Sequence, residues 1–283
     1  PPMSEEEGLE TTRIYSVAGL LRQGSGILRT RPFRAPHHTI SDQALIGGGG
    51  TQARPGEISL AHNGVLFLDE FPEFHRSVVE ALRQPLEEGS ITVTRVSQAV
   101  TYPCRTMVGL AFNPCPCGRM MDGAKECRCR MEEIVRYRDR LSGPMLDRID
   151  IHLEMPRLSY RELSDPAPAE SSRAIRRRVE AAREIQRHRF TGRKGKGTTG
   201  GSIQCNAHMT GARVKEACAL GRPAALLLKD AVVTLGLSGR AYDRVLKVAR
   251  TVADLAGSEA IQDEHVAEAI HYRSLDRTHM PQG

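Results

Sequence analysis

The sequence predicts an α/β core followed by a small all-helical domain. Three short apolar runs, at 65–70, 106–113 and 149–155, lack a clean alternation of apolar and polar residues. This is typical of strands that are buried on both faces of a parallel sheet. From about residue 205 onward the pattern becomes that of helices separated by glycines. A chain of 283 residues with 40% hydrophobic content is long enough to bury such a core.

The α/β core is expected over residues 1–170. It opens with a helix, because Ser4 and Glu7 have the spacing of a capping box. A helix at about 74–88 is predicted between the first two strands, since its apolar residues fall on one face. The stretch "ITVTRVSQAVTYPC", at 91–104, alternates apolar residues with threonine and predicts a β-hairpin that projects from the layer.

A basic segment, residues 171–204, connects the core to the last domain. Its residues 171–196 hold ten Lys or Arg and two Glu, a local charge of +8, whereas the whole chain carries +6. The first part has a helical pattern and the Gly/Lys/Thr-rich end is typical of a flexible loop. The charge favours contact with nucleic acid phosphates or with acidic groups of a neighbouring subunit, and a solvated helix with a linker is the alternative. The side chains that we expect to contact DNA are Arg173, Arg176, Arg177, Arg178, Arg183, Arg187, Lys194 and Lys196.

The helical domain, residues 205–283, contains four helical stretches whose breaks fall at Gly221, Gly236 and Gly257. No apolar stretch of the chain approaches the roughly 18 residues that would span a bilayer, and no secretory signal opens it. We therefore expect no membrane contact and a cytoplasmic location, where the seven cysteines would stay reduced.

Polar side chains follow two of the predicted strands. Asp69 and Glu70 end the run "VLFLDE", and Asn113 ends the second run. In open parallel sheets, ligands bind beyond the carboxyl ends of the strands. Asp69 is suited to hold Mg²⁺ and Glu70 to polarise an attacking water. From this stretch alone, two exposed acids that open a turn are an equally good interpretation.

Four cysteines form two CxC pairs separated by nine residues: Cys115, Cys117, Cys127 and Cys129. Four thiolates can hold one tetrahedral Zn²⁺, and Gly118 and Gly123 permit tight turns, so the pattern predicts a structural zinc site with no open position. The alternative is four reduced thiols without a metal. Cys104, Cys205 and Cys218 have no partners at useful spacing and are expected to be small core residues.

Adjacent histidines, His37 and His38, follow a short segment between Pro32 and Pro36. Neighbouring side chains of a strand point to opposite faces, which makes the two rings a poor chelating pair. A structural role on an edge strand is therefore favoured over a ligand role.

Five segments together carry a family resemblance. They are "RPFRAPHHTIS" (31–41), "GEISLAHNGVLFLDEFPEF" (56–74), "GLAFNPCPCG" (109–118), "YRDRLSGPMLDRIDIHLEMP" (137–156) and "LSGRAYDRVLKVARTVADL" (237–255). They closely resemble the magnesium chelatase-like AAA+ ATPases of the ComM/YifB type, and the likeness covers essentially the whole chain. It implies an α/β core of the P-loop type with an all-α lid, and ATP and Mg²⁺ as cofactors.

The resemblance also implies roles for single residues. Asp69 and Glu70 match the Walker B pair, Asp69 for the metal and Glu70 for the water, and Asn113 matches sensor 1. Arg148 resembles the arginine finger that reaches a neighbouring subunit's nucleotide. Arg240 is similar to sensor 2, a nucleotide-contacting residue of the lid, with Arg244 as the alternative. For both arginines, a surface salt bridge is the competing interpretation.

For the whole protein, the resemblance implies a hexameric ring that acts as a DNA helicase and promotes branch migration in natural transformation. Two alternatives stay open. One is a chelatase-type motor that remodels a partner protein, and the other is a zinc-stabilised nucleic-acid-binding module without catalysis.

The chain departs from the family in one respect: no GxxxxGK[ST] phosphate-binding loop is present. In the relatives this loop lies shortly before the segment that matches "PPMSEEE". We therefore expect the chain to be a C-terminal piece that lacks the first strand and the Walker A loop. Without the amides and lysine of that loop, the chain alone is expected neither to bind ATP tightly nor to hydrolyse it.

Overall fold

The protein's structure, a computed structural model, describes residues 1–48, 53–94, 99–120, 126–141, 143–164, 169–190 and 203–273. The chain divides into two compact units, Pro2–Leu141 and Ser142–Gly283. Residues 142–170, which we expect to belong to the core, fall in the second unit in this division.

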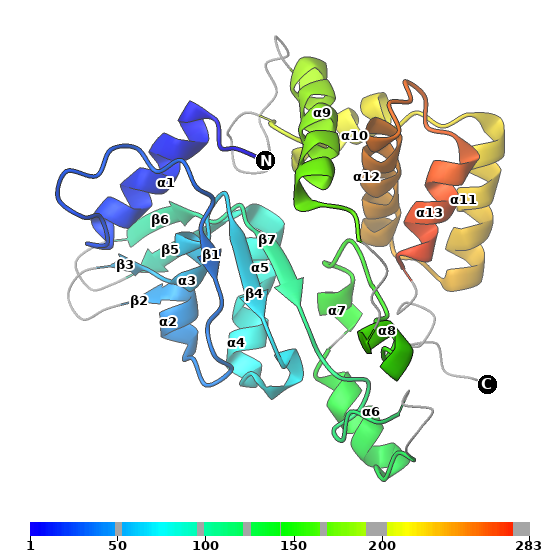
Figure 1. Cartoon of the computed structure of the whole chain (residues 1–283), viewed down its shortest axis with the longest axis horizontal. Coiled ribbons are helices and arrows are strands. Elements are labelled where there is room, and N and C mark those ends of the chain that lie inside the picture. Colours follow the sequence, from blue (N-terminus) through cyan, green and yellow to red (C-terminus); the bar gives the residue numbers. More distant parts are fainter. Residues whose placement is uncertain are drawn as a thin grey trace. The chain divides into compact units, whose positions relative to one another are not determined.

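The first unit is a mixed α/β layer (Figure 1). Its strands are β1 (Phe33–Arg34), β2 (Gly47–Gly48), β3 (Arg54–Pro55), β4 (Val65–Leu68), β5 (Ser90–Thr94), β6 (Ala99–Pro103) and β7 (Met107–Leu110). Its helices are α1 (Glu5–Val17), α2 (Asp42–Ile46), α3 (Glu57–Leu60), η1 (Phe71–Glu73), α4 (Arg76–Ala81), α5 (Arg83–Glu88) and α6 (Met131–Asp139). Among the described residues, β1, β4 and β7 form a parallel sheet in that order, and two antiparallel pairs, β2–β3 and β5–β6, stand apart from it.

The parallel sheet confirms two of the three predicted strands, β4 and β7. Leu66 and Leu68 of the central strand are fully buried, whereas Val65 and Phe67 between them are only partly buried and no residue of β7 is fully buried. The predicted burial of these strands on both faces is therefore wrong. The third strand of the sheet is β1, within the segment "RPFRAPHHTIS", and it lies at an edge of the sheet as the flanking prolines predict.

The predicted strand at 149–155 is wrong. The segment forms no regular element and pairs with no strand among the described residues, and its apolar side chains Ile151, Leu153 and Met155 are exposed. It is held in the second unit by other groups. The His152 N–H donates to the Tyr272 carbonyl at 2.7 Å, and the fully buried Arg273 side chain donates to the Ile149 carbonyl. Hydrogen bonds with Tyr272 and Arg273 therefore hold the segment, although it is not part of a sheet among the described residues.

A glycine permits the start of β4 to approach the chain before β1. The Val65 N–H donates to the Pro32 carbonyl at 2.8 Å. A Cβ atom on the preceding Gly64 would lie 2.0 Å from the same carbonyl oxygen, which no side chain could tolerate.

The helices and the hairpin of the first unit agree with the sequence prediction. The capping box of α1 is present in both directions: the Glu7 N–H donates to Ser4 Oγ and the Ser4 N–H to Glu7 Oε2. The helix predicted at 74–88 forms as α4 and α5, which meet at Leu82. Pro85 accounts for the break, because its ring clashes with the carbonyl four residues earlier and it offers no N–H. The predicted hairpin is β5–β6.

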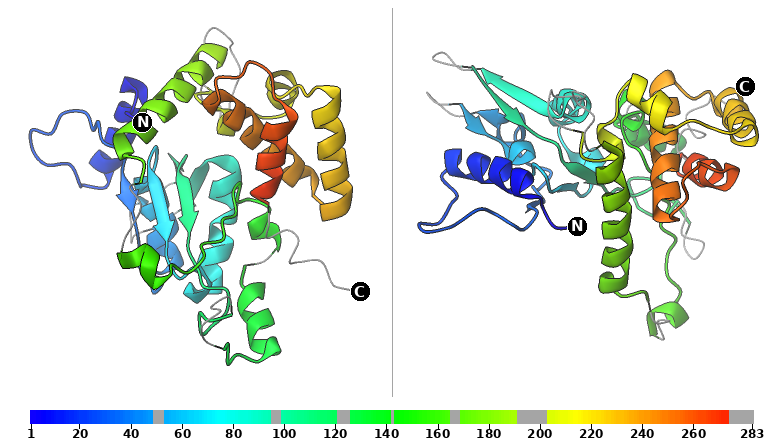
Figure 2. Two further views of the ribbon diagram at one scale, coloured as in Figure 1. Left: turned by 45° about the vertical axis from the view of Figure 1, so that its right-hand side comes forward. Right: turned by 90° about the horizontal axis from the view of Figure 1, so that it is seen from above.

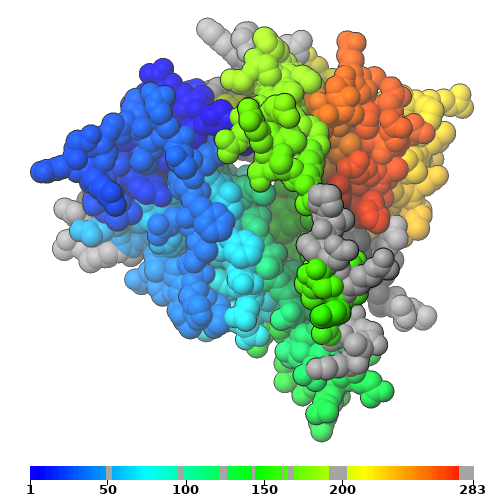
Figure 3. All heavy atoms as spheres, in the orientation of Figure 1, coloured from blue at the N-terminus to red at the C-terminus, as the bar shows by residue number. Residues whose placement is uncertain are grey.

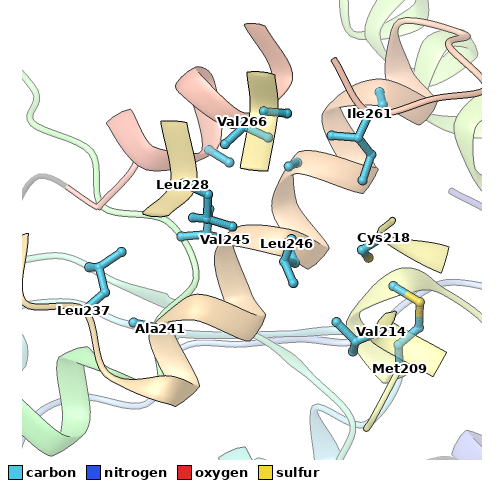
Figure 4. Close-up of a cluster of buried hydrophobic side chains, with 14 of the residues drawn as sticks. Met209, Val214, Cys218, Leu228, Leu237, Ala241, Val245, Leu246, Ile261 and Val266 are labelled. Atoms are coloured by element: carbon cyan, nitrogen blue, oxygen red, sulfur yellow. The ribbon is translucent and has the colours of Figure 1, made fainter. Parts of the chain in front are cut away.

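The second unit is all-helical where the structure describes it. It contains α7 (Gly143–Leu146), α8 (Tyr160–Ser164), α9 (Ser172–Phe190), η2 (Asn206–His208), α10 (Ala212–Ala217), α11 (Arg222–Leu235), α12 (Gly239–Leu255) and α13 (Asp263–His271). Figure 2 shows α11, α12 and α13 packed beside one another. Their apolar faces meet in one core, and Leu228, Val245 and Val266 are among its buried residues (Figure 4).

A buried charge network fixes α9 to this core. Asp254 on α12 is fully buried and accepts hydrogen bonds from Arg189 of α9 (2.8 Å), from Asn206 (2.7 Å) and from Arg250 (3.0 Å). The Arg250 guanidinium is itself 4% exposed and also donates to the Glu259 and Ser258 carbonyls. The last turn of the basic helix is thus attached to α12 by an ion pair in which Asp254 is fully buried and Arg189 is 19% exposed.

The substitution Asp254→Asn is expected to lower the free energy of unfolding by about 3–5 kcal/mol, because it leaves the buried Arg250 without its counter-charge. Urea unfolding followed by circular dichroism at 222 nm measures this. The control is Glu216→Gln, which removes one partner of the surface pair Arg213–Glu216 (3.0 Å) and should cost less than about 1 kcal/mol. Equal effects of the two changes would contradict the assigned role of the network.

Candidate functional site

The two predicted carboxylates lie directly after the central strand. β4 ends at the buried Leu68, and Asp69 and Glu70 are exposed. Glu70 has a left-handed backbone (φ 52°), which is uncommon for a residue with a Cβ atom, and its N–H donates to Asp69 Oδ1 at 2.9 Å. The tight turn thus presents both carboxylates at the end of the strand.

The ends of β4 and β7 are joined by backbone hydrogen bonds. The Ala111 N–H donates to the Leu68 carbonyl, and the Phe71 N–H donates to the Ala111 carbonyl, both at 3.0 Å. Asn113 follows two residues after Ala111 and is exposed. Because parallel strands end at the same edge of a sheet, the turn with the acids and the segment with Asn113 share that edge.

One of the two adjacent histidines, His38, lies at this edge. His38 Nδ1 lies 3.2 Å from Glu70 Oε2. The expectation that His37 and His38 point to opposite sides is wrong: their ring centroids lie 4.0 Å apart, because β1 ends at Arg34 and the histidines are beyond it. The histidine pair in "PHH" is visible in the sequence, but Glu70, the residue that His38 approaches, lies 32 residues further along the chain.

The two predicted arginines belong to the second unit, whereas Asp69, Glu70 and Asn113 belong to the first. Arg148 follows α7 and donates to the Pro144 carbonyl. Arg240 is exposed in the first turn of α12, where Ser238 Oγ caps the helix. Arg244, the alternative sensor 2 residue, pairs with Asp150.

The four clustered cysteines come together as a group. Their sulfur atoms all lie within 4.8 Å of one another. Cys115 lies 3.5 Å from Cys117 and 3.7 Å from Cys127, and Cys117 lies 3.6 Å from Cys127, sulfur to sulfur. A disulfide would need about 2.05 Å. Four ligands at the Zn–S distance of about 2.3 Å in a tetrahedron are about 3.8 Å apart, so the group can hold a metal ion of this kind.

Backbone amides also point at these sulfurs. The N–H groups of Arg119 and Arg128 donate to Cys117 and lower its pKa to about 6. The N–H of Cys129 donates to Cys127 and acts to lower its pKa, but burial and the neighbouring thiols raise the pKa of Cys127 overall, and burial raises that of Cys129 to about 12. Amides that bond a ligand sulfur favour the thiolate, which is the form that a metal binds.

The basic segment forms a helix, α9, whose surface is seen in light green in Figure 3. Arg173, Arg176 and Arg177 are exposed. Two further members are engaged by neighbouring acids: Arg178 with Glu170 at 2.8 Å, and Arg187 with Glu184. Of the remaining predicted contacts, Arg183 is half-buried, and Lys194 and Lys196 lie outside the described residues.

The other three cysteines differ from one another. Cys104 and Cys218 are buried, as predicted, and burial raises their pKa values to about 12 and about 11. Cys205 is not fully buried and has partners, so the expectation of an unpartnered core residue is wrong. Burial opposes its ionisation, but a hydrogen bond and the charge of His208, with that of Arg183, outweigh this and lower its pKa to about 6. The C-x-x-H spacing could have indicated the pair.

None of the described helices combines the length and the apolar character that crossing a membrane requires.

The comparison with known proteins decides the family. The model of the family "Magnesium chelatase, subunit ChlI" matches residues 1–163, which is more than half of the chain. The chain belongs to the magnesium chelatase ChlI family. The model for the C-terminal part of ChlI matches residues 169–273. The predicted membership among magnesium chelatase-like AAA+ proteins and the predicted fold class are thereby confirmed.

Curated relatives are similar over nearly the whole chain. The uncharacterized protein YifB of Salmonella typhimurium is 43% identical over 278 residues, 98% of this chain and 52% of YifB. The competence protein ComM of Haemophilus influenzae is 43% identical over 280 residues, again 98% of this chain and 52% of the relative. An uncharacterized protein of Mycobacterium tuberculosis is 41% identical over 273 residues, 96% and 52% of the two chains. The ChlI-family chain thus spans about half the length of these relatives.

Alkylation should separate two of the cysteines of this ChlI-family chain outside the cluster, Cys205 and Cys104. With a pKa of about 6, Cys205 is mostly thiolate at pH 7, so its rate of reaction with iodoacetamide should rise with pH up to about 6 and then level off. Cys104, with a pKa of about 12, should react far more slowly at pH 7 and continue to gain rate above pH 9. Peptide mass spectrometry after short exposures measures both rates.

The matched variant for this test is His208→Asn, which removes the charge beside Cys205 and should move the midpoint of its pH profile upward. Modification of Cys104 before Cys205 at pH 7 would contradict the assignment.

Proposed function

We propose that Asp69, Glu70 and Asn113 form the metal-binding and water-activating part of an ATP hydrolysis site in a AAA+ motor that acts on DNA. The observation that supports this most is the pairing of β4 with β7, whose ends are joined through the two hydrogen bonds of Ala111. Membership of the ChlI family and the likeness to a competence protein agree with it.

Each side chain of the edge has a chemical role in the proposal. Asp69 gives one carboxylate oxygen to the Glu70 amide, and the other suits Mg²⁺ or a metal-bound water. Glu70 polarises the attacking water, and the Asn113 amide orients that water and the γ-phosphate. ATP and Mg²⁺ are the proposed cofactors, with a structural Zn²⁺ at the four cysteines.

The phosphoryl group that is transferred carries negative charge, which positively charged side chains must stabilise. We assign Arg148 as the finger that acts on a neighbouring subunit's nucleotide and Arg240 as the lid residue on its own subunit's nucleotide. An arginine finger supplied in trans is worth on the order of 10³ to 10⁵ in rate. This proposal includes a hexameric ring of copies of the whole protein, working in the cytoplasm where ATP and DNA are both present.

The proposed DNA contact is the exposed side of α9. Because Arg189 ties the last turn of α9 to Asp254 of α12, a movement of the lid would carry the basic side chains with it. The chain is 4% aromatic and contains no Trp, which favours phosphate contacts over base stacking.

The catalytic proposal is tested in a protein that carries a phosphate-binding loop in addition to this chain, since the printed sequence holds no GxxxxGK[ST] segment. Glu70→Gln should lower kcat for ATP by about 10² or more and leave the Kd of ATP nearly unchanged, because it removes the base and not a phosphate contact. This chain alone should show no turnover.

The control for Glu70 is Glu73→Gln, an exposed carboxylate three residues further along that pairs with Arg140 at 3.6 Å. It should retain the parent rate. Full activity of Glu70→Gln, or turnover by this chain alone that the same substitution abolishes, would contradict the proposal.

DNA binding should depend on the exposed arginines of α9. Replacing Arg173, Arg176 and Arg177 by alanine should weaken binding and flatten the log–log salt dependence of affinity by up to about 0.9 per lost phosphate contact. Fluorescence anisotropy with a labelled duplex between 50 and 200 mM salt measures it.

The charge-matched control replaces three exposed arginines of the first unit, Arg13, Arg22 and Arg29. These changes should leave the slope unchanged. If both triple variants lose the same affinity, binding reflects net charge and not a surface on α9.

A second candidate is a chelatase-type motor that remodels a partner protein, which the name of the matching family favours. It predicts affinity for a protein and ATPase activity without salt-dependent DNA binding. A zinc-stabilised binding module, the third possibility, predicts no ATPase activity even when the phosphate-binding loop is present.

A further inference from the structure

The segment between β7 and α6 contains both Asn113 and the first two cysteines. Cys115 lies two residues after Asn113 and is fully buried. The chain then turns back, since the Gly118 N–H donates to the Cys115 carbonyl at 2.9 Å and Gly118 has a φ of 73°. The turn that carries Cys115 and Cys117 therefore folds back toward Asn113.

Asn113 is exposed, but it contacts both this turn and α6. A Cβ atom on Gly118 would lie 3.6 Å from Cγ and Oδ1 of the Asn113 side chain, so the glycine backbone packs against the amide. On the other side, the backbone of Asn113 hydrogen-bonds Tyr137 of α6. Arg138 Nε donates to the Pro114 carbonyl at 3.4 Å. The position of the amide therefore depends on how the cysteine turn is held.

The sulfur atoms of the cysteines link this turn to the second CxC pair, Cys127 and Cys129. Cys115 and Cys117 each lie within 3.7 Å of Cys127, and all four sulfurs lie within 4.8 Å of one another. Sulfur hydrogen bonds are weak, whereas a tetrahedral Zn²⁺ with four thiolates contributes folding energy outright. Four protein ligands leave no position for water or substrate, so such an ion would have a structural role.

We propose that one Zn²⁺, bound by Cys115, Cys117, Cys127 and Cys129, fixes Asn113 through the Cys115–Gly118 turn, so that the metal controls the hydrolysis step and not the binding of ATP. The effect on hydrolysis rests on the proposed function; the metal site and the position of Asn113 do not. Asn113 is the residue that would touch the reacting groups, and the cysteines act through it as positioning residues.

Metal content and the Asn113 amide test the structural part on this chain alone. Inductively coupled plasma mass spectrometry should find about one zinc per chain, and Cys129→Ser should reduce it at least fivefold. The control, Cys205→Ser, should keep it. The side-chain amide signal of Asn113 in a ¹⁵N NMR spectrum, assigned by its loss in Asn113→Ala, should shift or broaden when a chelator removes the zinc and return when zinc is added back.

Iron in place of zinc, no bound metal, or unchanged metal in Cys129→Ser would overturn the site. An Asn113 signal that is indifferent to zinc would overturn the link between the metal and the amide. Because these readouts need no ATP, they stand even if the protein hydrolyses none.

Kinetics test the functional part in the protein with its phosphate-binding loop. Cys129→Ser should lower kcat about tenfold or more with the Kd of ATP changed less than threefold. Asn113→Ala should lower kcat in the wild-type background but add little in the Cys129→Ser background, since the two changes would remove one effect. Additive losses would overturn the proposed route through Asn113. Absence of any ATPase activity in the parent protein would instead refute the proposed function.

Discussion

The parallel pairing of β4 with its two neighbours is the constraint on which the rest of the first unit depends. Leu66 and Leu68 of this strand are fully buried, and burial of two leucine side chains contributes roughly 3–6 kcal/mol. The register sets Leu68 opposite Leu110. Asp69, Glu70 and Asn113 lie within a few residues of those two positions, so a slip of one residue would turn the carboxylates away from the edge.

The segment "RPFRAPHHTIS" acquires a physical role from the same sheet. Pro32 accepts a hydrogen bond from Val65, and Arg34 pairs with Glu57, whose charge and hydrogen bond raise the pKa of the arginine. Past the strand, His38 Nδ1 lies 3.2 Å from Glu70 Oε2. The segment therefore both completes the sheet and reaches its acidic edge.

Sequence reasoning predicted what depends on local pattern. The capping box of Ser4, the hairpin at β5–β6, the helices of the lid and the two acids after a buried strand all follow from spacing and apolar period. The clustering of four cysteines also followed from two CxC pairs. In each case the interacting residues are near in the chain, or a single strong pattern fixes the element.

Contacts between segments that lie far apart in the chain could not be predicted from the sequence pattern. The apolar run at 149–155 resembles a buried strand, yet it pairs with no described strand and is held by a backbone bond to Tyr272 and a side-chain bond from Arg273. The pairing of His38 with Glu70 and the packing of Gly118 on Asn113 depend on turns whose direction no period encodes. The distribution of Arg148 and Arg240 into a unit separate from the acids likewise depends on the whole chain.

The central claim is that the edge formed by Asp69, Glu70 and Asn113 holds the metal and the nucleotide. The most direct measurement is a crystal structure of the protein with its phosphate-binding loop, bound to Mn²⁺ and a non-hydrolysable ATP analogue. We expect an anomalous peak for Mn²⁺ within about 2.2 Å of an Asp69 carboxylate oxygen, or of a water bound to it, with Glu70 and Asn113 facing the γ-phosphate. A metal–nucleotide complex bound at any other part of the fold would contradict it.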